Sequence, residues 1–132
     1  MSGTKEDIIK YRIDKSLRTF EDAKVLASAG RWNNCMKLFY YSSFYLVSDL
    51  LLKNTIKAET HKGVRTQFFN HFIKTGLLPK EFSDFYSNLF DSRQEEDYED
   101  FLNFDEETVM PLFDEVEEFN KKIIDLLLDS KS

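Results

Sequence analysis

The stretch RWNNCMKLFYYSSFYLVSDLLLKN, from Arg31 to Asn54, determines the fold class of this 132-residue chain. Its apolar side chains recur every three or four residues, which is the period of an amphipathic helix. Other apolar residues, Phe44 to Leu46, widen the apolar surface beyond one face, so we expect a helix that is central or partly covered by a second subunit. The main buried face is predicted to carry Trp32, Met36, Phe39, Tyr40, Ser43, Val47, Leu50 and Leu51.

Helical patterns continue on both sides of this stretch. A first helix is predicted over residues 5–28, with Thr4 as its N-cap and Gly30 as its left-handed C-terminal cap. Thr60 is placed to cap a third helix that ends at Gly76, and Pro79 suits the first turn of a fourth. The predicted buried positions of these helices are Ile9, Ile13, Leu17, Phe20, Ala23 and Ala27, then Val64, Phe68, Phe69 and Phe72, then Phe82, Phe85, Leu89 and Phe90.

A last helix follows Asp105, which we expect to cap it. Because proline cannot donate an interior helical hydrogen bond, Pro111 predicts either a helix start near Met110 or a bend. Its apolar stripe is Val109, Phe113, Val116, Phe119 or Asn120, Ile123 and Leu127. The sequence therefore predicts an all-α, up-and-down bundle of four to five helices, with residues 1–132 as a single domain.

Composition agrees with a few long elements. Only four glycines and two prolines are present, and all-β proteins need many more turn residues. No apolar run reaches the roughly 18 to 20 residues that a membrane span requires, and the polar stretch Met1 to Lys10 is unlike a signal peptide. We therefore expect a cytoplasmic protein without membrane association.

The lone Cys35 has no internal disulfide partner and is predicted to be a small buried hydrophobe.

Charge is unevenly distributed along the chain, whose formal net charge is −6. The segment from Lys53 to Lys80 has six basic residues and one acid, whereas the segment from Asp91 to Glu107 has nine acids and one arginine. Opposite patches that offset each other, within the bundle or across a dimer, are one explanation. A basic face that binds phosphate is the other.

Neither a metal nor a cofactor is predicted. His61 and His71 are ten residues apart, so on one straight helix they would point in different directions. The four glycines are isolated from one another, so no glycine-rich nucleotide loop is present. The helix start from Thr60 to Arg65 could still bind phosphate through its N–H groups and two cations. An ordinary capped helix start is the alternative.

A second unusual set of polar residues follows the fourth helix. If this segment is helical, Arg93 and Asp97 stand one turn apart, where opposite charges attract, and Tyr98 lies beside them. These residues are candidates for ligand binding. The alternative is a structural brace between the fourth helix and its neighbour.

Four short motifs, in this order along the chain, resemble the small stand-alone prokaryotic HEPN proteins. They are LFYYSSFY at 38–45, HKGVR at 61–65, FIKTGLLP at 72–79 and RQEEDY at 93–98, and the resemblance extends over about residues 8–128. It implies a helical bundle that is usually a homodimer and is often encoded beside a minimal nucleotidyltransferase. Such pairs frequently act as a toxin and its antitoxin.

The resemblance also implies a ribonuclease signature, which is Arg, four to six residues, and then His. In that chemistry His takes the proton of the 2′-OH and Arg stabilises the transition state. Here Arg93 matches the arginine, but Tyr98 stands five residues later, and a phenol with a pKa near 10 is a poor base. Arg65 and His71 have the right spacing, but six helical residues turn their side chains apart.

Three hypotheses follow. The first is a homodimeric module that binds RNA, a nucleotide or a nucleotidyltransferase partner. Its ligand-binding residues are His61, Lys62, Arg65, Arg93 and Asp97. The second is an active metal-independent ribonuclease toxin in which Arg93, Tyr98 and His61 are catalytic. It requires His61 to approach Arg93 in space. The third is a purely structural dimerisation domain, in which Arg93 contributes to stability alone.

Overall fold

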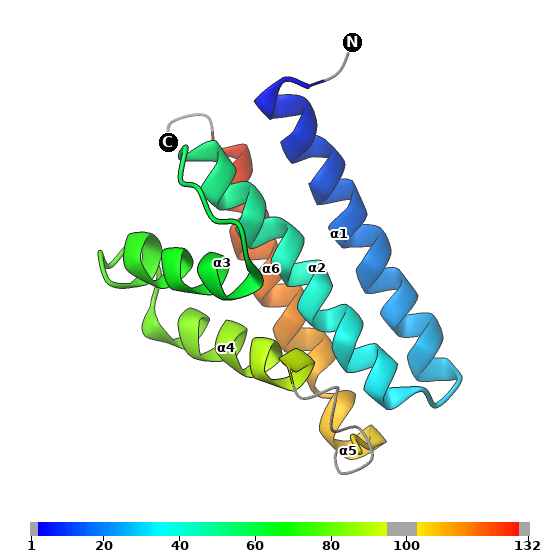
Figure 1. Ribbon diagram of the computed structural model, residues 1–132. Helices are drawn as coiled ribbons and strands as arrows, with labels where there is room; N and C mark the ends of the chain where they lie inside the picture. Colours follow the sequence, from blue (N-terminus) through cyan, green and yellow to red (C-terminus); the bar gives the residue numbers. More distant parts are fainter. Residues whose placement is uncertain (1–2, 95–102, 130–132) are drawn as a thin grey trace.

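The computed structural model describes residues 3–94 and 103–129, and within these ranges the chain is all-α, as predicted. The elements are α1 (Lys5–Ser28), α2 (Trp32–Lys53), α3 (His61–Phe68), the π-helix η1 (Phe69–Ile73), α4 (Lys80–Gln94), α5 (Glu106–Val109) and α6 (Leu112–Leu128). Figure 1 shows α1 and α2 as an antiparallel pair, with α6 packed beside α2. The α3–α4 pair lies on the side of α2 away from α1, at an oblique angle to α2.

Helix α2 is the centre of the bundle, because it contacts α1, α3, α4, α5 and α6. Its Phe39, Tyr40, Leu46 and Val47 are fully buried, which confirms the central position predicted from its wide apolar surface. Cys35 is also fully buried, as predicted. Burial raises the pKa of its thiol to about 11, so the reactive thiolate is scarce at neutral pH.

The predicted helix ends are confirmed by their hydrogen bonds. Thr4 accepts from the Asp7 N–H at 3.0 Å, Thr60 from the Gly63 N–H at 2.9 Å, and Asp105 from the Thr108 N–H at 2.9 Å. Each bond satisfies a donor that the first helical turn would otherwise leave unpaired. Gly30 has a φ of +72°, the left-handed conformation that terminates α1. Pro111 separates α5 from α6, which agrees with the break predicted there.

Two predicted core positions are wrong. Leu17 is 51% exposed, because its neighbour Ser16 takes the inward position and donates a hydrogen bond to the Ser42 carbonyl at 2.7 Å. Phe69 is 41% exposed. It begins the π-helix η1, whose Lys74 N–H reaches back five residues to the Phe69 carbonyl. The wider turn keeps Phe68 and Phe72 buried but moves Phe69 to the edge.

No helix among the described residues is both long enough and apolar enough to cross a membrane.

Candidate functional site

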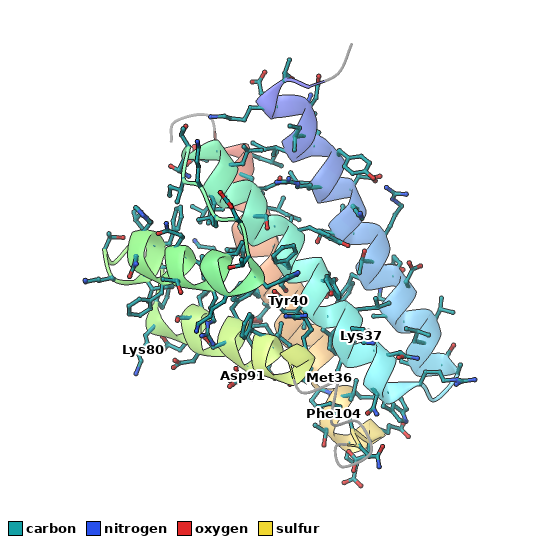
Figure 2. The ribbon with its side chains drawn as sticks, viewed as in Figure 1. Met36, Lys37, Tyr40, Lys80, Asp91 and Phe104 are labelled. Carbon is teal, nitrogen blue, oxygen red and sulfur yellow. The ribbon has the colours of Figure 1, made fainter. Side chains whose placement is uncertain are left out.

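The candidate site is centred on Tyr40, in the middle of α2. Figure 2 shows Tyr40 where the start of α3 and the end of α4 approach α2. The Tyr40 ring is fully buried, and its hydroxyl forms a 2.7 Å hydrogen bond with Nδ1 of His61. The His61 ring stacks on Phe44, with the ring centroids 4.3 Å apart. Two residues of α2 therefore fix both the position and the plane of the imidazole.

The start of α3 places His61 against these rings. Thr60 caps the helix by accepting from the Gly63 N–H, so His61 is the first residue of α3. A Cβ atom at position 63 would lie 3.0 Å from the Thr60 hydroxyl oxygen, closer than side-chain carbons ordinarily approach. The glycine of the HKGVR motif is therefore explained by the close approach of the cap.

Two arginines reach the same region from α3 and α4. The guanidinium carbon of Arg65 lies 4.4 Å from the centroid of the Phe90 ring, and that of Arg93 lies 5.7 Å from the same centroid. Arg93 also lies 5.5 Å from the Tyr40 centroid. Both cations thus face the negative surfaces of aromatic rings, an arrangement that favours a guanidinium group. We call Tyr40, His61, Arg65, Phe90 and Arg93 the cation cluster.

Two buried polar atoms in or beside the cation cluster have no partner among the described residues, one on Arg93 and one on Tyr86, whose ring lies next to that of Tyr40. Within the described part of the chain, the Arg93 Nε atom has no hydrogen-bond acceptor. The hydroxyl of the fully buried Tyr86 has no partner there either. Although Tyr86 and Tyr40 perturb each other's pKa, their geometry does not make a hydrogen bond. Buried polar groups are rarely left unpaired, so each such atom calls for an explanation.

Burial controls the protonation of the cluster. It lowers the pKa of His61, and the positive charge of Arg93 lowers it further, so the imidazole is neutral at pH 7. Burial raises the pKa of Tyr40 to about 12, which keeps its phenol protonated. A neutral imidazole and a phenol share one hydrogen bond in either of two ways. If Tyr40 donates, Nε2 of His61 carries a proton; if His61 donates, Nε2 is a free base.

The structure brings together three of the predicted site residues, namely His61, Arg65 and Arg93. Lys62 is exposed on the first turn of α3. Arg65 forms a long 3.6 Å ion pair with the exposed Asp91 of α4, which links the basic and acidic segments of the chain. Asp97 and Tyr98 lie outside the described residues, so their predicted roles stay predictions.

Sequence reasoning missed the part played by two tyrosines. Tyr40 was predicted to be a core residue, and it is one, but its hydroxyl also orients His61, which lies 21 residues later. Tyr86 was not singled out at all. The sequence does contain a signal for both residues, because Tyr40 and Tyr86 lie within apolar helical stripes and are therefore expected to be buried. A buried tyrosine hydroxyl usually needs a hydrogen-bond partner, so each marks a polar contact inside the bundle.

Comparison with known proteins identifies the family. The HEPN domain model matches residues 9–126. The chain is 35% identical to a UPF0332 protein of Thermotoga maritima over 127 residues, which are 96% of each chain. It is 32% identical, over 66% of this chain and 59% of the relative, to a Methanocaldococcus jannaschii protein named "Putative toxin MJ0142". A UPF0332 protein of Archaeoglobus fulgidus is 26% identical over 88% of this chain and 92% of its own. The chain therefore belongs to the HEPN domain family.

Proposed function

We propose that this protein is a binding module that recognises the phosphate groups of RNA or of a nucleotide through the cation cluster. The observation that carries the proposal is the convergence of Arg65 and Arg93 on one aromatic ring, beside a neutral imidazole. None of the carboxylates in the described part of the chain forms an ion pair with Arg93, so none of these competes with an anion for its charge. Guanidinium groups bind phosphate oxygens well, because their donors form a planar fork.

Replacing Arg93 with methionine is expected to weaken RNA binding by about tenfold, which corresponds to about 1.4 kcal/mol. The measurement is fluorescence anisotropy of a labelled single-stranded 12-mer RNA at low salt, with ATP as a competitor that separates nucleotide from RNA recognition. The slope of log affinity against log salt should fall by about 0.7, the value expected for one lost phosphate contact on a single strand.

The control for this experiment is Arg18→Met. Arg18 is an exposed arginine of α1 that pairs with Asp14. Helix α1 lies on the side of α2 away from α3 and α4 (Figure 1). The Arg18→Met variant should bind the RNA with wild-type affinity. If Arg93→Met also keeps that affinity but melts at a lower temperature, the purely structural role of Arg93 replaces our proposal.

A second candidate function is metal-independent RNA cleavage, and the neutral state of His61 next to Arg93 favours it. His61 would remove the proton from the 2′-OH, the 2′-oxygen would attack phosphorus, and the 5′-oxygen would leave and take a proton from water. Arg93 would stabilise the charge that develops on the phosphate oxygens. The toxin name of the Methanocaldococcus jannaschii relative agrees with this candidate.

His61→Gln is expected to lower the cleavage rate by at least a hundredfold, because a positioned base contributes about that much. The readout is the appearance of RNA fragments ending in a 2′,3′-cyclic phosphate. The rise of the rate with pH should be centred below the ordinary imidazole pKa of about 6.5, since burial and Arg93 lower the pKa of His61. If the wild-type protein binds the RNA but the RNA is still intact after long incubation, cleavage is excluded and the binding function alone remains.

We further propose that the active form is a homodimer with a nucleotidyltransferase as its partner. Family membership supports this, as does Tyr41 of α2, whose side chain is only partly buried in one copy. Light scattering should give twice the 15.7 kDa of one chain, and a tagged copy should retain the partner on a column. A mass of one chain at all concentrations tested would contradict pairing.

A further inference from the structure

A cavity lies next to the cation cluster, between α1, α2 and the link that leads into α3. Its volume is about 520 Å³, within the range of sites that hold small molecules. Of the cation cluster, His61 alone is among the residues that line it. The other lining residues used below are Arg12, Phe44, Tyr45, Ser48 and Lys57.

The polar groups of this cavity are suited to an anion. Arg12 and Lys57 supply two positive charges, against the single acid Glu59 among the lining residues. Arg12 makes one long contact, at 3.4 Å, with the buried Asp49, and its side chain remains 37% exposed. A guanidinium group has five N–H donors, so Arg12 keeps several for another acceptor.

The hydroxyl of Ser48 provides a second, independent indication of a ligand. Ser48 is one of the residues that line the cavity, and its hydroxyl oxygen is buried just behind the cavity wall without a hydrogen-bond partner among the described residues. A serine inside a helix commonly donates to the carbonyl four residues earlier, but Ser48 does not. An unpaired buried hydroxyl costs about 1–3 kcal/mol, a cost that an acceptor oxygen in the cavity would remove.

The walls are suited to a flat apolar body. The apolar lining consists of the rings of Phe44 and Tyr45 and of five aliphatic residues, namely Leu51, Leu52, Ile56, Ala58 and Val64. We propose that this cavity binds a small organic anion with a ring-sized apolar body, whose charged group is held by Arg12, Lys57 and the Ser48 hydroxyl. Its rings would lie against Phe44, the residue on which His61 stacks.

The test uses the sulfonate dye 1-anilinonaphthalene-8-sulfonate, which has a charged group and two ring systems, with the full chain under native conditions. We expect one dye to bind per chain with increased fluorescence. Arg12→Gln should weaken binding by about tenfold. Ser48→Leu, which removes the hydroxyl and fills part of the cavity with apolar atoms, should weaken it as much. Circular dichroism checks that both variants remain folded.

Two further variants separate this site from other surfaces. Lys24→Gln alters a different groove, between α1 and the α5–α6 region, and should leave dye binding unchanged. Arg93→Met should also leave dye binding unchanged, while Arg12→Gln should keep RNA affinity. Dye binding that survives both Arg12→Gln and Ser48→Leu, or that is lost equally in Lys24→Gln, would overturn the proposal. Loss in Arg93→Met would likewise overturn it, because the two sites would then be one.

Discussion

Replacing Asp49 with asparagine is expected to stabilise the protein at pH 8 by up to about 4 kcal/mol and to change its stability little at pH 4. The Asp49 side chain is fully buried on α2, and among the described residues only one of its oxygens has a partner, the guanidinium of Arg12 at 3.4 Å. Burial therefore raises the pKa of Asp49 to about 7, although Arg12 opposes the change. Asparagine has nearly the same shape and never acquires the charge.

The direction of the effect follows from proton binding. An unfolded aspartate has a pKa near 3.9, so between about pH 4 and pH 7 the folded protein holds a proton that the unfolded chain has lost. Unfolding then releases a proton, and the free energy of unfolding falls as pH rises through this window. Below pH 4 both states are protonated and the full stability is present. Above pH 7 both are ionised, and the folded state retains a buried charge.

Urea unfolding of both proteins at a series of pH values checks this prediction. The informative quantity is the difference between variant and wild type, because titrations elsewhere in the chain cancel. Asp14→Asn is the matched control, since Asp14 is 66% exposed and pairs with Arg18 on the surface of α1. This exposed substitution should change the free energy of unfolding by less than about 0.5 kcal/mol. If the difference in unfolding free energy between Asp49→Asn and wild type is the same at every pH, Asp49 is already ionised at pH 5 and the prediction is wrong.

Much of the fold could be predicted because its determinants are local in sequence. Thr4, Thr60 and Asp105 each satisfy an N–H three residues away, and the interruption at Pro111 requires only the missing N–H of proline. The exposure of Leu17 could not be predicted in this way. It depends on Ser16 finding a carbonyl on α2, 26 residues further along the chain. A period of three or four residues does not distinguish between two adjacent positions at the edge of a stripe.

The candidate site was only partly predictable for a related reason. The motifs pointed to His61, Arg65 and Arg93, and α2 brings them together by presenting Tyr40 to α3 and α4 at once. The buried hydroxyls of Tyr40 and Tyr86 belong to no motif, because their surroundings come from elements far apart in sequence. Asp49 was missed as well. A charged residue within an apolar run resembles a solvated position until the packing of α1 against it is known.

Replacing Asn120 with alanine is expected to lower the free energy of unfolding by about 2–4 kcal/mol, because it breaks a polar network inside the core. Asn120, on α6, is 6% exposed. Its side-chain oxygen accepts from the Ser43 hydroxyl at 2.8 Å, and its nitrogen donates to the Ser42 hydroxyl at 3.2 Å. Ser42 in turn accepts at its carbonyl from Ser16 of α1, so the network ties three helices together.

Alanine removes both hydrogen bonds at Asn120 and leaves the Ser43 hydroxyl buried without its acceptor. A double-mutant cycle tests this cause directly. Ser43→Ala and Asn120→Ala together should cost about 1 kcal/mol less than the sum of the single changes, since the second removes a group that the first has already left unpaired. The exposed Asn88 of α4 supplies the matched control, and Asn88→Ala should change stability by less than about 0.5 kcal/mol. Strict additivity in the cycle would show that the cost arises from lost volume alone, and the network would then have no role in aligning α1, α2 and α6.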